Sequence, residues 1–361
     1  MDNSGNHIHF LDVSRAWHIL APASASAAQY AAEELAAYFG LLRERAGLDK
    51  EQPPIEDAET VSPPGAAPLI LLNTAAGDIA HNGFTWRLGN GRIEIHGDSA
   101  RGLWNGVFDF LSALGFRWPK PGVEELPAAP SGENTAAYPL KDDRAYSPSA
   151  ANARERRRLV INEKTGTRER ERLIRWAARN KIDALVFSLR EKSFWDRAGR
   201  GGKIYGAERY ALALEAGGGD LSLLLPRSLF LFHQDMFRME SGKRTREHHF
   251  CPTNPKTTAR ITRRAKELFG RALPGMTAQS GEPVFHLWPD SEHEKTWCAC
   301  PACRAFSPAE QNRIAVNTAA DALSAAAPAA LLSYKNDPGE SGGIAPRKNT
   351  FVLSPLTVVY Q

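Results

Sequence analysis

The sequence predicts an α/β protein in which a small α/β sandwich precedes a (β/α) barrel of the TIM type. Three observations support this fold class. The chain has 361 residues, which exceeds one ordinary domain and suggests two. Apolar patterns of strand and helix type alternate along both halves. A stretch rich in Pro, Gly and Ala, residues 116–140, lies between the halves.

The N-terminal α/β domain is expected over residues 1–127. Residues 24–47 repeat apolar side chains at helical spacing, and residues 98–115 form a second helical pattern that starts at Asp98 or Ser99 and stops at Gly115. The segment "FTWRLGNGRIEIHG" predicts a hairpin, because two alternating segments flank Gly-Asn-Gly. Further strands are expected at residues 7–13 and 69–74.

A linker is expected over residues 128–149, followed by a catalytic-like barrel domain over residues 150–361. Helices are predicted at residues 170–181, 258–273 and 311–327, and strands at residues 157–162, 182–189, 209–218, 283–290, 330–337 and 349–360. These are six strands, whereas a closed barrel has eight. The domain is therefore predicted to be an incomplete barrel, a product truncated at its C-terminus, or an open sheet.

The charge pattern gives little support for nucleic-acid binding. The net charge is +4, and the basic runs 154–158 and 168–172 are both interrupted by Glu. We interpret the second run as the solvated start of a helix. A nucleic-acid binder built on these arginines and the cysteines is the weakest interpretation, and it predicts binding to DNA that depends steeply on salt.

The sequence predicts a cytoplasmic protein without a membrane partner. No segment has the roughly 20 consecutive apolar residues that a membrane-spanning helix needs. Residues 1–17 are polar and lack the basic start and apolar core of a signal peptide. Cysteines of a cytoplasmic protein are expected to be reduced.

The strand predicted at residues 283–290 ends in "HLWPDSE" and supplies candidate catalytic groups. Barrel active sites lie at the carboxyl ends of strands, which places Asp290 and Glu292 there. Glycoside hydrolysis needs one carboxylic acid and usually a second carboxylate. Trp288 would raise a nearby carboxyl pKa and could stack on a sugar ring. The alternative is that Asp290 caps a turn and Trp288 belongs to the core.

Other strand ends supply candidate contacts to a substrate. A basic side chain there would suit the carboxylate of a uronic acid, and glycines allow a ligand close to the backbone. The alternative for each residue is solvated surface. The candidates are Glu163, Arg190, Asp220, Tyr334 and Lys335.

The four cysteines are candidate ligands of a structural zinc ion. Cys298, Cys300 and Cys303 have C-x-C-x-x-C spacing, and Cys251 precedes them. Four thiolates form a closed tetrahedral site of the structural kind. The alternatives are four free thiols or a disulfide formed in an oxidising compartment. No other cofactor is expected.

Several segments carry a resemblance to a known family. Residues 97–127, "GDSARGLWNGVFDFLSALGFRWPKPGVEELP", are similar to the end of the small domain that precedes the barrel in alpha-glucuronidases and hexosaminidases. The second half resembles their relatives, the family catalogued as domain of unknown function 4838. The matching pieces are "RNKIDALVF", "GGGDLSLLLP", "FCPTNP", "WCACPAC", the helix with Asn317, and "SYKNDP". This chain has Gly219 where the family has a histidine.

The resemblance covers nearly the whole chain and implies a TIM-type barrel that acts on glycosides. Together with the carboxylates it predicts a glycoside hydrolase-like protein, alpha-glucuronidase-like in type. Its expected substrates are oligosaccharides that contain uronic acids or amino sugars, cleaved by carboxylic acid catalysis. The alternative is a non-catalytic carbohydrate-binding protein or a degenerate barrel.

Overall fold

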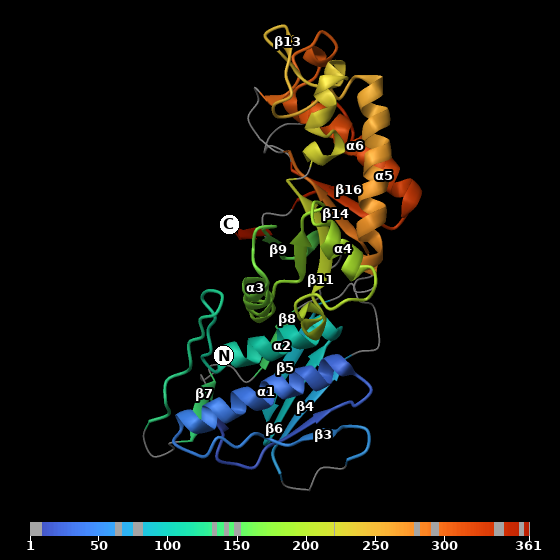
Figure 1. The fold of residues 1–361 in the computed structure, drawn as a ribbon. Helices are drawn as coiled ribbons and strands as arrows, with labels where there is room; N and C mark the ends of the chain where they lie inside the picture. The colour runs from blue at the N-terminus through green and yellow to red at the C-terminus, as the bar shows by residue number, and fades with distance from the viewer. Residues whose placement is uncertain are drawn as a thin grey trace, which may run out of the picture. The chain divides into compact units, whose positions relative to one another are not determined.

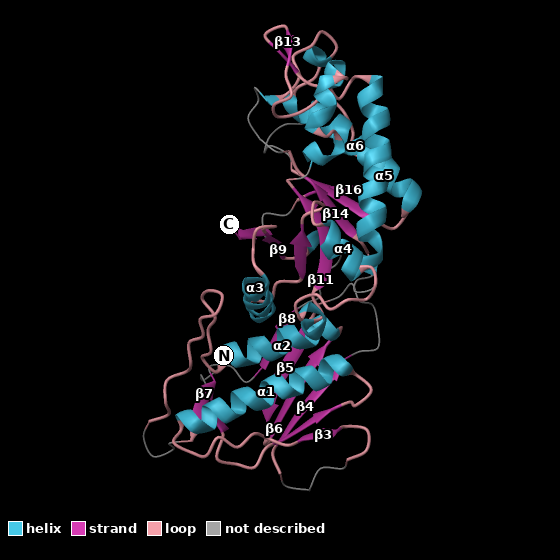
Figure 2. Ribbon diagram, viewed as in Figure 1, coloured by secondary structure: helices cyan, strands magenta, loops and turns pink. Residues whose placement is uncertain are grey.

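The computed structural model describes residues 9–61, 67–74, 82–131, 136–140, 144–147, 153–219, 221–277, 282–289, 296–335, 343–353 and 357–360. The chain divides into two compact units (Figures 1 and 2). Unit 1 comprises Met1–Asn152, Gly166–Asp183 and Tyr205–Leu212, and unit 2 comprises Ala153–Thr165, Ala184–Ile204 and Ala213–Gln361. The domain boundaries expected near residues 127 and 150 stay a prediction.

Unit 1 contains a six-stranded mixed sheet in the order β3-β2-β4-β6-β5-β8. Its strands are β2 (His18–Ala21), β3 (Ile55–Asp57), β4 (Leu69–Thr74), β5 (Phe84–Gly89), β6 (Arg92–Gly97) and β8 (Arg144–Ser147). The predicted hairpin is confirmed, because β5 and β6 pair antiparallel. Asn90 and Gly91 form its turn, both with positive φ, as a two-residue hairpin turn requires.

Two helices, α1 (Ser26–Arg45) and α2 (Ala100–Ala113), pack on one face of this sheet and on each other (Figure 1). Side chains alternate along β5 between buried and exposed, as expected for a strand covered on one face. Ser99 caps α2 as predicted, since its Oγ accepts from the Gly102 amide at 3.0 Å.

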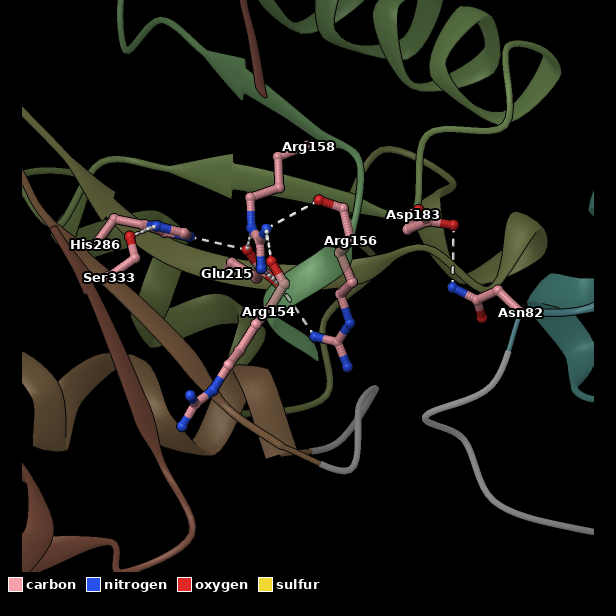
Figure 3. Close-up of polar contacts among 8 residues, drawn as sticks. All are labelled: Asn82, Arg154, Arg156, Arg158, Asp183, Glu215, His286 and Ser333. Carbon is pink, nitrogen blue, oxygen red and sulfur yellow. Dashed lines mark hydrogen bonds and ion pairs between the residues drawn. The ribbon is translucent and has the colours of Figure 1, made fainter. Parts of the chain in front are cut away.

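A third helix, α3 (Thr167–Arg179), also belongs to unit 1 and lies against α2. The buried Arg101 guanidinium donates to the carbonyl oxygens of Ala178 at 2.9 Å and Tyr210 at 3.2 Å. The Asn82 amide donates to Asp183 at 3.0 Å (Figure 3). Two short strands, β1 (His9–Asp12) and β7 (Ala137–Leu140), pair antiparallel.

Unit 2 contains a seven-stranded parallel sheet in the order β16-β15-β14-β11-β10-β9-β17. The strands are β9 (Arg158–Ile161), β10 (Ala184–Phe187), β11 (Ala213–Gly218), β14 (Val284–Leu287), β15 (Leu331–Tyr334), β16 (Thr350–Val352) and β17 (Thr357–Tyr360). Five of the six predicted strands are confirmed as β9, β10, β11, β14 and β15. The fold class is therefore α/β with a parallel barrel-type sheet.

The prediction of one strand over residues 349–360 is wrong. The segment forms β16 and β17, which lie at opposite edges of the sheet. Pro355 stands between them in the sequence, and proline cannot donate to a strand ladder. Five Cα steps join Val352 to Thr357, so these residues are at most about 19 Å apart. A flat sheet would separate its edge strands by about 29 Å, so the sheet must curl.

Three helices belong to unit 2: α4 (Lys192–Ala198), α5 (Pro255–Thr277) and α6 (Pro308–Ala326). Helix α5 packs on α4, α6 and β11, and α6 also contacts β15. Ser307 and Glu310 form a capping box that fixes the start of α6. Because α6 begins soon after the cysteines, this cap sets where the preceding segment joins the helix.

The sequence patterns missed several short elements. They are β2, β3, β7, β8, α4 and a hairpin of β12 (Met239–Glu240) and β13 (Lys243–Arg244). Each is too short for a period to be recognised, and β3 lies in a Pro-rich stretch. None of the helices in the described part of the chain is long and apolar enough to cross a membrane.

Gly217 in β11 is a position where only glycine fits. Its φ is +127°, and a Cβ there would lie 2.0 Å from the carbonyl oxygen of His286. We expect Gly217→Ala to lower the free energy of unfolding by more than about 2 kcal/mol, measured by urea denaturation. Gly219→Ala is the control, because a Cβ at Gly219 meets no atom within 4 Å. Equal effects of the two substitutions would contradict this prediction.

Candidate functional site

The carboxyl ends of the parallel strands in unit 2 lie at one edge of the sheet. Glu163 follows β9 and Arg190 follows β10, whereas Trp288 follows β14, and Tyr334 and Lys335 lie at the end of β15. Asp220, Asp290 and Glu292 lie outside the described residues. The other candidates lie at strand ends, as expected from the sequence.

Trp288 and Lys335 come together at this edge. The Lys335 ammonium lies 5.4 Å from the centre of the Trp288 ring, at cation–π distance. The Trp288 backbone extends the pairing of β14 with β11, since its amide donates to the Gly218 carbonyl at 2.9 Å. Trp288 is only 5% exposed, so its ring lines the edge from within and does not project into solvent.

Tyr334 is buried beside the same strand end. The Arg313 guanidinium of α6 lies 5.6 Å from the centre of its ring. The Asn312 amide, also on α6, donates to the Lys335 carbonyl at 3.1 Å. Helix α6 therefore positions the end of β15, and with it the lysine over Trp288.

Glu163 and Arg190 are exposed and lie further along the edge. They follow strands that are three and two positions away from β14 in the sheet. At a strand spacing of about 4.8 Å, and because the sheet curls, their strands lie at most roughly 14 Å and 10 Å from β14. The Arg190 guanidinium donates to Ser222 Oγ at 3.1 Å. The structure thus brings Trp288, Tyr334 and Lys335 together at one end of the edge.

A buried polar network crosses the sheet below Trp288, with Glu215 of β11 at its centre (Figure 3). Arg158 of β9 donates through Nε to Glu215 Oε2 at 2.6 Å, and Arg156 donates to Oε1 at 3.1 Å. His286 of β14 lies 2.8 Å from Glu215 Oε2 and 2.5 Å from Ser333 Oγ. Since these side chains touch one another, they share one face of the sheet.

The network fixes the protonation of its members. Burial alone would raise the pKa of Glu215, but Arg158, His286 and Arg156 hold it well below its ordinary value. Burial lowers the pKa of His286, although Glu215 opposes this. Glu215 is therefore an ionised acceptor and His286 is neutral. It follows that His286 donates through Nε2 to Glu215 and accepts through Nδ1 from Ser333.

Ser333 links the network to the candidate site, because its Oγ accepts from the Trp288 indole nitrogen at 3.4 Å. The hydrogen bonds run in one direction, from Trp288 through Ser333 and His286 to Glu215. Serine, histidine and glutamate have the connectivity of a hydrolytic triad. All three are 0% exposed, so no substrate reaches Ser333 and the network positions Trp288 instead.

Glu215 lies within the strand predicted at residues 209–218, but the sequence patterns did not identify its partners. The signal was present: Arg158 stands at the start of an apolar strand, and His286 and Ser333 each interrupt one. A polar side chain within a buried parallel strand needs a partner on the same face. The sequence alone does not say which strands are neighbours, so the partners could not be paired.

The four cysteines form a separate cluster in unit 2. All are buried, and their sulfur atoms lie within 4.8 Å of one another. The Sγ atom of Cys251 is 3.7 Å from that of Cys300 and 3.6 Å from that of Cys303. The predicted grouping of Cys251 with the C-x-C-x-x-C segment is confirmed, and the cluster has the composition of a metal site.

The fold is similar to that of solved GH20 enzymes. The β-N-acetylhexosaminidase from Streptomyces coelicolor A3(2) matches with a TM-score of 0.53 and 15% identity, covering 96% of this chain and 66% of its own. The Flavobacterium johnsoniae chitobiase matches with a TM-score of 0.55 and 14% identity, covering 98% and 52%. This chain therefore spans between about half and two thirds of their length.

At 14–15% identity the similarity shows a shared fold. No protein-family model matches the chain, and no curated protein matches it in sequence. Membership of the domain-of-unknown-function 4838 family stays a prediction.

Removing the Glu215 carboxylate should abolish its ion pairs with the buried Arg158 and Arg156. We expect Glu215→Ala to lower the free energy of unfolding by about 3–5 kcal/mol. Glu171→Ala is the control, because Glu171 is exposed on α3 and its loss should change stability by less than about 0.5 kcal/mol. Urea denaturation measures the free energy of unfolding of both variants. If Glu215→Ala is destabilised as little as Glu171→Ala, the structural role of Glu215 is contradicted.

The protonation of the network also predicts how stability depends on pH. In the unfolded chain, His286 takes up a proton below its ordinary pKa of 6.5 and Glu215 below its ordinary pKa of 4.5. In the folded chain both pKa values are lowered, so each group takes up its proton only at a lower pH. Stability should therefore fall as pH drops from 7 to 5.5, and again below 4.5. Urea midpoints at each pH test this. If His286→Gln loses as much stability between pH 7 and 5.5 as the wild type does, the assignment of this loss to His286 is wrong.

Proposed function

We propose that this chain is a glycoside hydrolase that acts on amino-sugar-containing glycans by carboxylic acid catalysis. The observation that carries the proposal is the similarity of fold, over 96–98% of the chain, to a β-N-acetylhexosaminidase and a chitobiase. The placement of Trp288, Tyr334 and Lys335 at the carboxyl edge of a parallel sheet supports it, because barrel enzymes carry their sites there.

Asp290 and Glu292 are the proposed catalytic carboxylates. Asp290 follows Trp288 by two residues in the sequence. One carboxylic acid would protonate the glycosidic oxygen, and the other would act as nucleophile or base. The apolar Trp288 ring would keep the acid protonated near neutral pH by raising its pKa.

The remaining candidates are proposed to bind the sugar. Trp288 offers an apolar ring edge, and Lys335 offers a cation that donates to hydroxyl or carbonyl oxygens of the substrate. Tyr334 supports this pair from β15. Glu163, Arg190 and Asp220 are proposed to contact further sugar units along the edge.

We also propose that Cys251, Cys298, Cys300 and Cys303 hold a structural zinc ion. Four thiol ligands close the coordination sphere and leave no position for a substrate. The metal would therefore take no part in the carbohydrate chemistry.

The test is release of nitrophenol from aryl β-N-acetylglucosaminide and aryl glucuronide substrates. The wild type should hydrolyse the amino-sugar substrate, and Asp290→Asn should lower kcat by about 10²–10⁴-fold. Asp196→Asn is the matched control, because Asp196 is a half-exposed carboxylate on α4, and it should leave kcat unchanged.

Other outcomes revise the proposal in defined ways. Retained activity in Asp290→Asn with loss in Glu292→Gln would move the acid to Glu292. Hydrolysis of the glucuronide alone would overturn the amino-sugar specificity. No hydrolysis, with chitooligosaccharide binding detected by calorimetry, would favour a non-catalytic carbohydrate-binding protein.

A further inference from the structure

The four cysteines form a buried cluster of their own, beside the buried aromatic side chains of Phe237, Phe250 and Trp297. We call residues 236–251 and 296–306 together the cysteine module. Its buried cluster consists of the four cysteines, with Met239 packed against them. The β12–β13 hairpin has two residues in each strand, and a two-stranded hairpin is marginally stable in water by itself.

Backbone hydrogen bonds bring the two segments of the module together at the cysteines. The Ala299 amide donates to the Met239 carbonyl at 2.8 Å across the two segments, whereas the Cys251 amide donates to the Met236 carbonyl at 2.8 Å within the first segment. The Met239 amide donates to Cys298 Sγ at 3.3 Å. Arg244 also lies near this sulfur, with Nη1 at 3.8 Å.

Two separations between the sulfurs agree with a tetrahedral metal site. Zinc–sulfur bonds of about 2.3 Å in a tetrahedron place neighbouring sulfurs about 3.8 Å apart. The observed separations of 3.7 Å and 3.6 Å from Cys251 agree with this spacing. All four sulfurs come from buried residues, so the site is closed to solvent and to substrate.

Helix α6 anchors one side of the module. The Gln311 side chain accepts from the Cys298 amide at 3.0 Å and donates to the carbonyl oxygens of Cys298 at 3.1 Å and Cys303 at 3.3 Å. These contacts hold residues 298–303 on α6. The segment 236–251 meets residues 296–303 at the sulfurs and where the His249 ring stacks on the Trp297 ring, with ring centres 4.1 Å apart.

We infer that the cysteine module is a metal-dependent folding unit, which zinc holds together within a sheet that folds without it. The inference rests on the proposed zinc ion. Binding forms four Zn–S bonds and breaks four S–H bonds, and the protons pass to the solvent. Without the metal, the module loses its centre while the seven-stranded sheet keeps its own buried network.

The first test measures the metal itself. The purified chain should contain one zinc per chain, and Co²⁺ added after chelation should give the absorption of tetrahedral cobalt thiolate. Cys303→Ser should abolish the four-thiolate spectrum, whereas Thr253→Val should keep it. Thr253 is the matched control because its hydroxyl touches Cys303 Sγ at 3.2 Å without being a thiol ligand. Absence of zinc together with absence of the cobalt spectrum would overturn the site.

The second test measures folding of the wild type, so it does not depend on a cysteine variant that fails to fold. Hydrogen exchange followed by mass spectrometry should show amides of residues 236–251 exchanging at least about tenfold faster after chelation. Peptides covering β9, β11 and β14 should keep their protection. Unchanged exchange in the module, or unfolding of the whole of unit 2, would overturn the inference. Neither test uses a glycoside, so its outcome is independent of whether the chain hydrolyses one.

Discussion

The buried charge of Glu215 is the constraint on which the organisation of unit 2 depends. A carboxylate removed from water is stable only with charged partners and hydrogen bonds, and β9 and β14 supply them. A shift of β9 by one residue would turn Arg158 to the opposite face and remove its ion pair with Glu215. The network therefore determines the register of these strands, because their apolar residues alone would pack in more than one register.

The same network connects the interior of the sheet with its carboxyl edge. Trp288 is held by its backbone pairing to Gly218 and by its indole hydrogen bond to Ser333. The orientation of a residue at the candidate site is thus set by groups that no substrate touches. Support of this kind is what holds a binding residue in one rotamer.

The larger elements could be predicted from the sequence because their signals are local. Helices α1, α2, α5 and α6 repeat apolar residues over several turns, and the β5–β6 hairpin has an Asn-Gly turn between alternating strands. The separation of β16 from β17 could not be predicted in the same way. It depends on pairing with β15 and β9, which are remote in the sequence.

The candidate site was predictable to a different degree. The strand-end rule places Trp288, Tyr334 and Lys335 at one edge, and the spacing of the cysteines indicates a cluster. Which side chains meet within the sheet follows from strand order, as with Arg158, Glu215 and His286. Strand order is a property of the whole fold, so it cannot be predicted from the sequence of single segments.

The pairing of β9 with β17 has a consequence for how the protein is made. Arg158 lies opposite Thr357, about 200 residues later in the chain. At synthesis rates of about 5–20 residues per second, β9 waits roughly 10–40 s for this neighbour. During that time one edge of β9 has unpaired backbone groups, and such an edge invites pairing with another chain. Protein yield in the cell should thus depend on how long the ribosome takes to deliver β17, as well as on the stability of the finished fold.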